Sequence, residues 1–174
     1  MVSTANNSRK IVLYQPQQVD QSFGPRSSGD MIPLEMLSIA IFPEREGYEI
    51  VIIDGSLYDQ EEAHKRVVEA CEGALLYGVT GILGFMVKDG YLCSQQVRAA
   101  HPEIKIVAGG WFASVRPDLL LKTWEDVADH VGEAEKAFWD VIQATAAGES
   151  WDDLGSLALW RDGDVIKNPK NPVV

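Results

Sequence analysis

Short apolar runs rich in β-branched residues recur along the chain, separated by longer segments of mixed polarity. There are five: Lys10–Tyr14, Glu49–Ile53, Gly81–Phe85, Lys105–Ala108 and Val127–Val131. Apolar side chains follow one another in these runs instead of alternating with polar ones. This pattern is typical of strands that are buried on both faces, as in a parallel sheet covered by helices.

The segments between these runs predict helices. They cover Pro33–Glu46, Gln60–Tyr77, Gly90–Ala100, Pro117–Thr123 and Glu133–Ala147. Gly47 and Gly148 follow the first and the last segment, where glycine commonly ends a helix. The alternation predicts an α/β fold: a doubly wound, Rossmann-like or flavodoxin-like five-stranded parallel sheet flanked by helices.

The pattern changes after Gly148. Leu157–Ile166 predicts two short strands joined at Asp162-Gly163, a dipeptide that favours a tight hairpin turn. The tail that follows contains Pro169 and Pro172, which continue neither strand. We expect residues 1–150 to form the Rossmann-like domain and residues 151–174 to form a hairpin and a linker toward a missing downstream domain.

Composition and charge limit the classes of partner that the chain is expected to bind. The chain has 174 residues, 46% of them hydrophobic, which suits one globular domain. A net charge of −11 argues against binding to a phosphate backbone. No apolar run approaches the roughly 20 residues of a membrane span, and the polar first ten residues lack the apolar core of a signal peptide. We therefore expect a cytoplasmic protein with neither nucleic acid nor membrane as partner.

Metal-ligating patterns are absent from the sequence. Cys71 and Cys93 have no paired ligand spacing, and free cysteines are commonly buried as small apolar residues. His64, His101 and His130 are scattered along the chain. We predict no metal site built from protein side chains and no catalytic residue.

Ligands of open parallel sheets bind beyond the carboxyl ends of the strands. Gly109-Gly110 after the fourth run would let a flat ligand approach the backbone, and Glu133 would stand where a helix dipole favours a carboxylate. The candidate binding residues are Gln15, Asp54, Ser56, Leu57, Gly84, Phe85, Met86, Val87, Gly109, Gly110, Trp111, Phe112, Gly132 and Glu133.

The same loops exclude several common ligands. Gln15-Pro16-Gln17-Gln18 stands where a dinucleotide fold needs GxGxxG, and neither a P-loop nor a receiver's acidic cluster is present. Glycines and aromatic residues dominate, with almost no cations, so we predict a large, flat, mostly uncharged and deeply held ligand. Structural roles stay open for several candidates: Gly109-Gly110 as a tight turn, Asp54 and Glu133 as helix caps, and Met86, Trp111 and Phe112 as core residues.

Several motifs, taken in order, resemble a known family. They are Gly47–Asp54, Gly81–Gly84, Pro102–Gly110, Pro117–Leu120, Gly132–Glu135 and the hairpin Trp160–Asn168. Together they resemble the cobalamin-binding domain that precedes the radical S-adenosylmethionine barrel in cobalamin-dependent methyltransferases and related enzymes. The resemblance covers roughly Arg9 to Asn168.

The resemblance implies that cobalamin is the ligand. The Asp-x-His-x-x-Gly motif that supplies a histidine to cobalt in other cobalamin proteins is missing, which implies base-off binding without a histidine ligand. The detached nucleotide tail would run along Gly84, Gly109 and Gly110, and the lower face of the corrin would lie over Phe85–Val87. Cobalt would be carried by cobalamin, with no protein ligand.

The resemblance also implies a partner domain. This chain lacks the Cys-x-x-x-Cys-x-x-Cys motif that holds an iron–sulfur cluster. The cluster and S-adenosylmethionine would therefore belong to a radical domain, in cis or in trans, and this chain would not be catalytic alone. Two alternatives stay open: a stand-alone cobalamin carrier or sensor, and a flavodoxin-like nucleotide-binding or interaction module.

Overall fold

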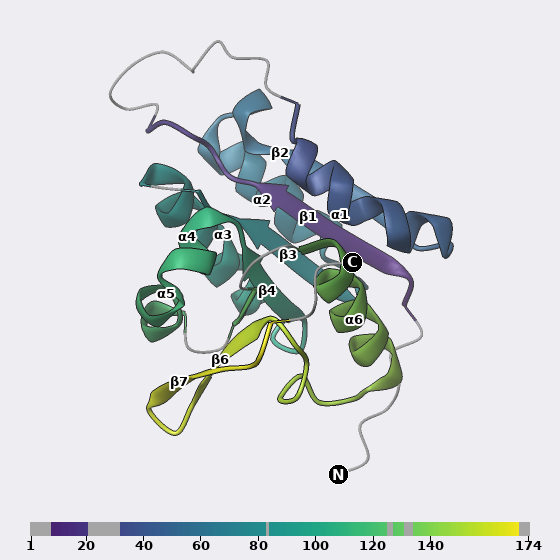
Figure 1. Cartoon of the computed structure of the whole chain (residues 1–174). Helices are drawn as coiled ribbons and strands as arrows, with labels where there is room; N and C mark the ends of the chain where they lie inside the picture. Colours follow the sequence, from purple (N-terminus) through teal and green to yellow (C-terminus); the bar gives the residue numbers. More distant parts are fainter. Residues whose placement is uncertain (1–7, 21–31, 83, 125–126, 131–133, 171–174) are drawn as a thin grey trace.

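The computed structural model describes residues 8–20, 32–82, 84–124, 127–130 and 134–170. Within these residues one seven-stranded sheet runs through the molecule in the order β2-β1-β3-β4-β5-β6-β7 (Figure 1). The strands are β1 (Lys10–Gln15), β2 (Glu49–Asp54), β3 (Leu76–Thr80), β4 (Lys105–Gly109), β5 (Ala128–His130), β6 (Leu157–Arg161) and β7 (Asp164–Lys167).

The first four strands form the parallel part of the sheet. The predicted α/β alternation is therefore confirmed for β1 to β4. The fifth predicted strand corresponds to β5, in which Ala128 and Asp129 pair in parallel with β4, and Val131 of the prediction lies outside the described residues. The predicted hairpin is also present, and β6 pairs antiparallel with β5, so the hairpin continues the sheet.

Helices cover both faces of the sheet (Figure 1). Among the described residues, α1 and α6 pack on one face, while α2 and α3 pack on the other. The helices are α1 (Leu34–Arg45), α2 (Gln60–Ala70), α3 (Phe85–Ala100), α4 (Trp111–Val115), α5 (Pro117–Thr123) and α6 (Ala134–Ala147), with a 3₁₀ turn η2 (Gly55–Leu57) after β2. None of them is long and apolar enough to cross a bilayer.

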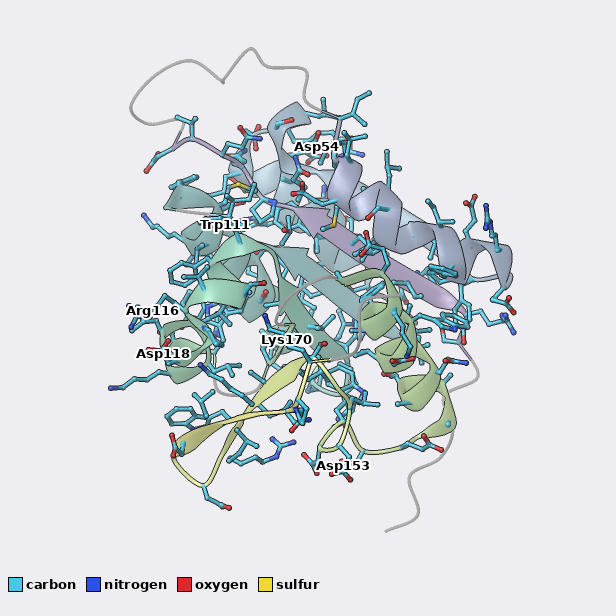
Figure 2. The ribbon with its side chains drawn as sticks, in the orientation of Figure 1. Asp54, Trp111, Arg116, Asp118, Asp153 and Lys170 are labelled. Atoms are coloured by element: carbon cyan, nitrogen blue, oxygen red, sulfur yellow. The ribbon has the colours of Figure 1, made fainter. Side chains whose placement is uncertain are left out.

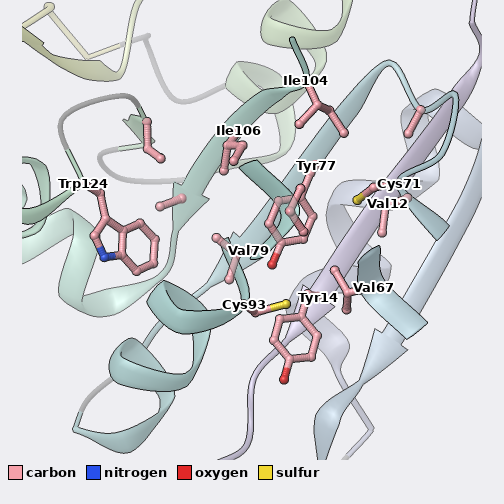
Figure 3. Close-up of a cluster of buried hydrophobic side chains, with 14 of the residues drawn as sticks. Val12, Tyr14, Val67, Cys71, Tyr77, Val79, Cys93, Ile104, Ile106 and Trp124 are labelled. Atoms are coloured by element: carbon pink, nitrogen blue, oxygen red, sulfur yellow. The ribbon is translucent and has the colours of Figure 1, made fainter. Parts of the chain in front are cut away.

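Strand β1 shows why its sequence reads as an unbroken apolar run. Ile11 and Leu13 point to the α1/α6 side, and Val12 and Tyr14 point to the α2/α3 side. All four side chains are fully buried. Figure 3 shows the core on the α2/α3 side, where Tyr14 and other strand residues pack against helix residues such as Val67 and Cys93.

The third strand differs from the prediction. We expected it over Gly81–Phe85, but β3 spans Leu76–Thr80. Helix α2 ends at Ala70, and the chain turns at Gly73 with φ +67°, a conformation that favours glycine. The strand therefore begins within the segment that was expected to be the end of a helix.

The shift also moves the start of the next helix. The apolar residues after Gly81 lead into α3, which begins at Phe85 and not near Gly90 as expected. Apolar runs of four to six residues do not distinguish a buried strand from the first turn of a buried helix. That ambiguity placed the strand five residues too late.

The predicted ends of the first and last helices and the predicted hairpin turn are confirmed at their glycines. Gly47 after α1 has φ +82°, and Gly148 after α6 has φ +70°. In the hairpin, Asp162 and Gly163 have φ values of +51° and +84°, as a tight turn between β6 and β7 requires.

A close approach joins the ends of β3 and β4. Gly81 donates its N–H to the carbonyl of Gly109 at 2.9 Å, and Phe112 donates its N–H to the carbonyl of Gly81 at 3.1 Å. Between them, Gly110 has φ +100°, and a Cβ placed on it would lie 2.8 Å from the Gly81 carbonyl oxygen. A side chain at this position would therefore meet the backbone at the end of β3.

We predict that Gly110→Ala lowers the free energy of unfolding by about 1–3 kcal/mol, because it combines a positive φ with a backbone clash. Urea denaturation of the whole chain measures the change. Gly73→Ala is the matched control: Gly73 also has a positive φ, but no heavy atom lies within 4 Å of its added Cβ. A loss at Gly110 no larger than the loss at Gly73 would contradict the close approach.

Candidate functional site

A cavity of about 380 Å³ lies between the sheet and helices α1 and α6, at the carboxyl ends of β3 and β4. This volume is within the range of roughly 300–1,000 Å³ that is usual for small-molecule sites. Its lining consists of Glu35, Met36, Ser38, Ile39, Gly78, Val79, Thr80, Ile82, Val107, Ala108, Gly109, Gly110, Trp111, Ser114, Ala134, Glu135 and Phe138.

Two cross-strand pairs form the floor of the cavity. Gly78 pairs with Val107, and Thr80 pairs with Gly109 at the carboxyl edge. Residues two apart on a strand point to the same face, so all four face α1 and α6. Because each pair contains a glycine, one of its two residues adds no side chain to the floor. A Cβ on Gly78 would lie 2.8 Å from Cδ2 of Leu13 and 3.6 Å from the Phe138 ring.

The two helices form the walls. Met36 and Ile39 of α1 and Phe138 of α6 are buried apolar side chains that line the space. Ser38 donates its hydroxyl to Oε1 of Glu135 at 2.9 Å, which joins the helices above the floor. The described lining is thus mostly apolar, with a few polar side chains near the starts of the helices and at the strand ends.

Thr80 is the most buried polar side chain in the lining, with an exposed fraction of 4%. Its hydroxyl stands at the carboxyl end of β3, in the cavity lining. A buried hydroxyl can donate one hydrogen bond and accept others, and leaving it unpaired is unfavourable. Thr80 therefore offers one polar contact to a ligand in the cavity.

Trp111 stands at the opening of the cavity with 69% of its surface exposed. It begins α4 directly after Gly110. In Figure 2, Trp111 and Asp54 lie at the carboxyl-terminal end of the sheet, away from Asp153 near the hairpin. An exposed indole beside an apolar opening suits contact with a flat ligand.

The structure brings three of the predicted site residues into the cavity lining: Gly109, Gly110 and Trp111. Asp54 instead accepts a hydrogen bond from the Ser56 N–H at 2.9 Å and so caps the turn η2. Leu57 is 63% exposed outside the cavity.

The other predicted residues have separate places. Phe112 packs against the core on the α2/α3 side. Gly84–Val87 stand at the start of α3 and not at a strand end, with Met86 buried in that first turn. Gln15 is buried at the end of β1, and its Oε1 has no partner among the described residues. Gly132 and Glu133 lie outside the described residues.

Sequence reasoning missed most of the lining. The helix residues Met36, Ile39 and Phe138 look like ordinary core positions in the sequence. The one available signal was Gly78, because a glycine inside an apolar strand often marks a close approach of a ligand or another backbone. With the third strand placed too late, Gly78 and Thr80 fell between the predicted helix Gln60–Tyr77 and the predicted strand Gly81–Phe85.

A second buried cluster lies on the opposite face, around Asp89 of α3. This carboxylate accepts hydrogen bonds from Tyr14 Oη at 2.6 Å and from the Gln17 N–H at 3.0 Å. It also accepts one from Gln60 at 2.6 Å and contacts His64 Nε2 at 2.9 Å. Asp89 and His64 are 0% and 3% exposed. They belong to different helices, so no local sequence pattern indicates that they meet.

The cluster fixes the loops at the carboxyl edge. Burial alone would raise the pKa of Asp89, but the hydrogen bonds from His64, Tyr14, Gln60 and Gln17 outweigh it and hold that pKa below its ordinary value. Burial and the neighbouring Asp89 raise the pKa of Tyr14 far above its ordinary range. The Gln17 side chain also donates to the carbonyls of Gly55 and Tyr58, so β1, η2, α2 and α3 meet at one carboxylate.

Two of the histidines are held away from the cavity. His64 contacts Asp89 through Nε2 and Gln96 through Nδ1, at 2.9 and 3.1 Å. His101 follows the carboxyl end of α3, and its Nε2 lies 2.9 Å from the carbonyl of Val68. Within the described residues, no group of three His, Cys, Asp or Glu side chains is placed to hold a metal ion.

Comparison with solved structures identifies the fold. The chain is similar to the radical S-adenosylmethionine methyltransferase TsrM from Kitasatospora setae in a structure with cobalamin and a 4Fe–4S cluster bound, with a TM-score of 0.76 and 18% identity. It is also similar to OxsB, a cobalamin-dependent S-adenosylmethionine radical enzyme, in a structure with aqua-cobalamin and S-adenosylmethionine bound, with a TM-score of 0.75 and 12% identity.

Both matches cover 96% of this chain, which spans 30% of the TsrM chain and 23% of the OxsB chain. At these identities the likeness establishes the fold alone. No protein-family model and no curated protein sequence matches the chain.

We predict that Asp89→Asn lowers the free energy of unfolding at neutral pH by about 2–3 kcal/mol, because the amide leaves buried donors unpaired. The Asp89 pKa is lowered in the folded state, so its contribution is present above the ordinary value of 3.8 and is lost as the pH falls through the lower folded value. The difference between wild type and variant should therefore shrink on acidification. Urea denaturation from neutral pH to below pH 3.8 measures it, with exposed Asp153→Asn as control.

Proposed function

We propose that this chain is a cobalamin-binding domain whose cavity holds the nucleotide tail of the corrinoid. The observation that carries the proposal is the cavity itself: a largely apolar space with a glycine-containing floor that opens at the carboxyl edge of the sheet. The likeness in fold to TsrM and OxsB supports the proposal, because those two proteins have cobalamin bound in their solved structures. The sequence resemblance points to the same ligand.

The cavity suits a flat heterocycle. Gly78 and Gly109 keep the floor low, and Met36 and Phe138 stand on opposite walls. The hydroxyl of Thr80 can donate a hydrogen bond to the ring nitrogen that becomes free when the base leaves the cobalt. The sugar and phosphate would then lie toward the opening, and the corrin would cover the carboxyl edge with its lower face toward Phe85–Val87.

The charge of the lining favours a corrinoid over a flavin or nucleotide phosphate. Among the described residues of the lining, none is Lys or Arg. Glu35 and Glu135 lie there instead, and the chain carries a net charge of −11. A phosphate monoester or polyphosphate would be repelled, whereas the single phosphodiester of cobalamin carries less charge and lies nearer to solvent.

We further propose that the cobalt receives no histidine from this chain. His64 is engaged with Asp89, and His101 stands at the other end of α3. His130 ends β5, so it is the one histidine whose backbone reaches the carboxyl edge. An axial ligand tunes the reactivity of its metal, so the absence of a strong donor would leave the cobalt more weakly ligated from below.

The chemistry would require a second domain. When bound, cobalamin supplies a cobalt centre that accepts and donates a methyl group. We propose that a radical S-adenosylmethionine domain, in cis or in trans, holds the iron–sulfur cluster and meets the upper face of the corrin. Residues 151–174 would lead toward it. The role of this chain is to bind and orient the corrinoid and to keep water from its lower face.

We predict that hydroxocobalamin binds to the purified chain and that Val107→Phe weakens binding at least tenfold. The added ring would occupy the floor of the cavity where the base is expected to lie. Titration followed by visible absorption gives the dissociation constants, and circular dichroism checks that the variant folds. Ile166→Phe, on the exposed face of β7, is the control for added aromatic surface.

Equal binding by Val107→Phe and wild type would place the tail elsewhere. Absence of binding by wild type at micromolar protein would contradict the proposed function as a whole and would favour a nucleotide-binding or interaction module.

We predict that His130→Ala leaves the visible spectrum of the bound corrinoid unchanged, because an uncoordinated imidazole cannot alter the cobalt absorption bands. The spectra of wild type and variant are compared at saturating hydroxocobalamin. A displaced band in the variant would identify His130 as a cobalt ligand and would overturn the proposal of histidine-free binding.

A further inference from the structure

The inner half of the cavity differs from its outer half. Helices α1 and α6 both begin at the carboxyl edge, since each follows the end of a parallel strand. Their first residues therefore stand at the opening, and Ile39 and Phe138 stand about one helical turn, or about 5.4 Å, deeper. On the floor, the pair Gly78–Val107 lies inward of the pair Thr80–Gly109.

Four buried side chains of the described lining are apolar. Val107, Met36, Ile39 and Phe138 are 4%, 4%, 9% and 5% exposed. The backbone of the inner floor is engaged, because Gly78 and Val107 take part in the ladders that join β3 to β1 and β4. Ser38 precedes Ile39 on α1, but its hydroxyl is already donated to Glu135 at 2.9 Å, so it leaves an entering base without a donor at this depth.

Most polar side chains of the described lining stand nearer the opening. Thr80 stands at the carboxyl end of β3, and Glu35 lies in the first turn of α1. Ser38 and Glu135 are hydrogen-bonded to each other at 2.9 Å, so they already satisfy part of their own capacity. A base that enters from the opening would therefore meet polar groups first and purely apolar groups at its far edge.

Corrinoids differ in the edge of the lower base that would lie deepest in the cavity. The lower base dimethylbenzimidazole ends in two methyl groups, whereas adenine ends in ring nitrogens and an exocyclic amine. Buried polar groups without partners weaken binding, and sites exploit this difference to reject ligands of similar size. The inner half of the cavity fits the methyl groups and leaves the adenine ring nitrogens without a hydrogen-bond donor.

We infer that the cavity selects corrinoids with an apolar lower base over those with adenine, and that Val107 is a residue that determines this specificity. The inference rests on the proposed function, since it concerns the same cavity. It adds the class of corrinoid that the chain accepts.

The test compares three probes on the full chain by visible-absorption titration: hydroxocobalamin, the hydroxo form of the adenine-containing cobamide, and cobinamide, which lacks the nucleotide tail. We expect the adenine cobamide and cobinamide to bind at least about tenfold more weakly than hydroxocobalamin. Equal or tighter binding of the adenine cobamide would overturn the inference while the proposed function stands. Binding of none of the three would overturn both.

Variants of one valine locate the effect. Val107→Thr places a hydroxyl in the inner half and should reduce the preference for hydroxocobalamin at least threefold, because the hydroxyl can pair with a nitrogen of adenine. Val12→Thr is the matched control: Val12 is an equally buried strand valine on the α2/α3 face, and its variant should keep the wild-type preference. A preference that Val107→Thr leaves unchanged would overturn the assignment of this residue.

Discussion

The absence of a side chain at Gly78 is the constraint on which the candidate site depends. Gly78 lies in the middle of β3 and pairs with Leu13 on one side and with Val107 on the other. A Cβ there would lie 2.8 Å from Cδ2 of Leu13 and 3.6 Å from the Phe138 ring, so alanine would displace Leu13 and take up space beside the cavity. Protein interiors are normally packed without large voids. The cavity beside this glycine therefore offers room for a ligand that a fully packed face would exclude.

The two faces of the sheet have different structural roles. On the α2/α3 side, apolar packing is continuous, and the Asp89 cluster joins the first two strand-end loops to α2 and α3. On the α1/α6 side, the core is interrupted by the cavity, and Ser38 and Glu135 connect the helices. The closed face can hold the carboxyl edge in place while the open face receives the ligand. A site that is already formed costs less conformational entropy on binding.

Sequence reasoning predicted the parts that depend on hydrophobic pattern and glycine signals. The alternation of strands and helices, the glycine-terminated helices and the hairpin turn at Asp162-Gly163 all follow from local chemistry. The third strand was misplaced because short apolar runs suit either a strand or a helix start. The contact between Asp89 and His64 was beyond prediction, because it joins two helices across 25 positions of the sequence. The lining residues of α1 and α6 were missed for the same reason: their roles depend on the tertiary packing and not on their own segment.

Gly109 and Gly110 are adjacent, but each is required to be glycine for a different reason. Gly109 pairs with Thr80 and faces the cavity, so its missing side chain benefits a ligand. Gly110 also borders the cavity, but the space that its side chain would need is occupied by the Gly81 backbone. Its missing side chain therefore benefits the fold, because it lets the loop before α4 close over the end of β3. A substitution at Gly110 tests the folding of this loop, and a substitution on the floor beside Gly109, at Val107, tests the binding of a ligand.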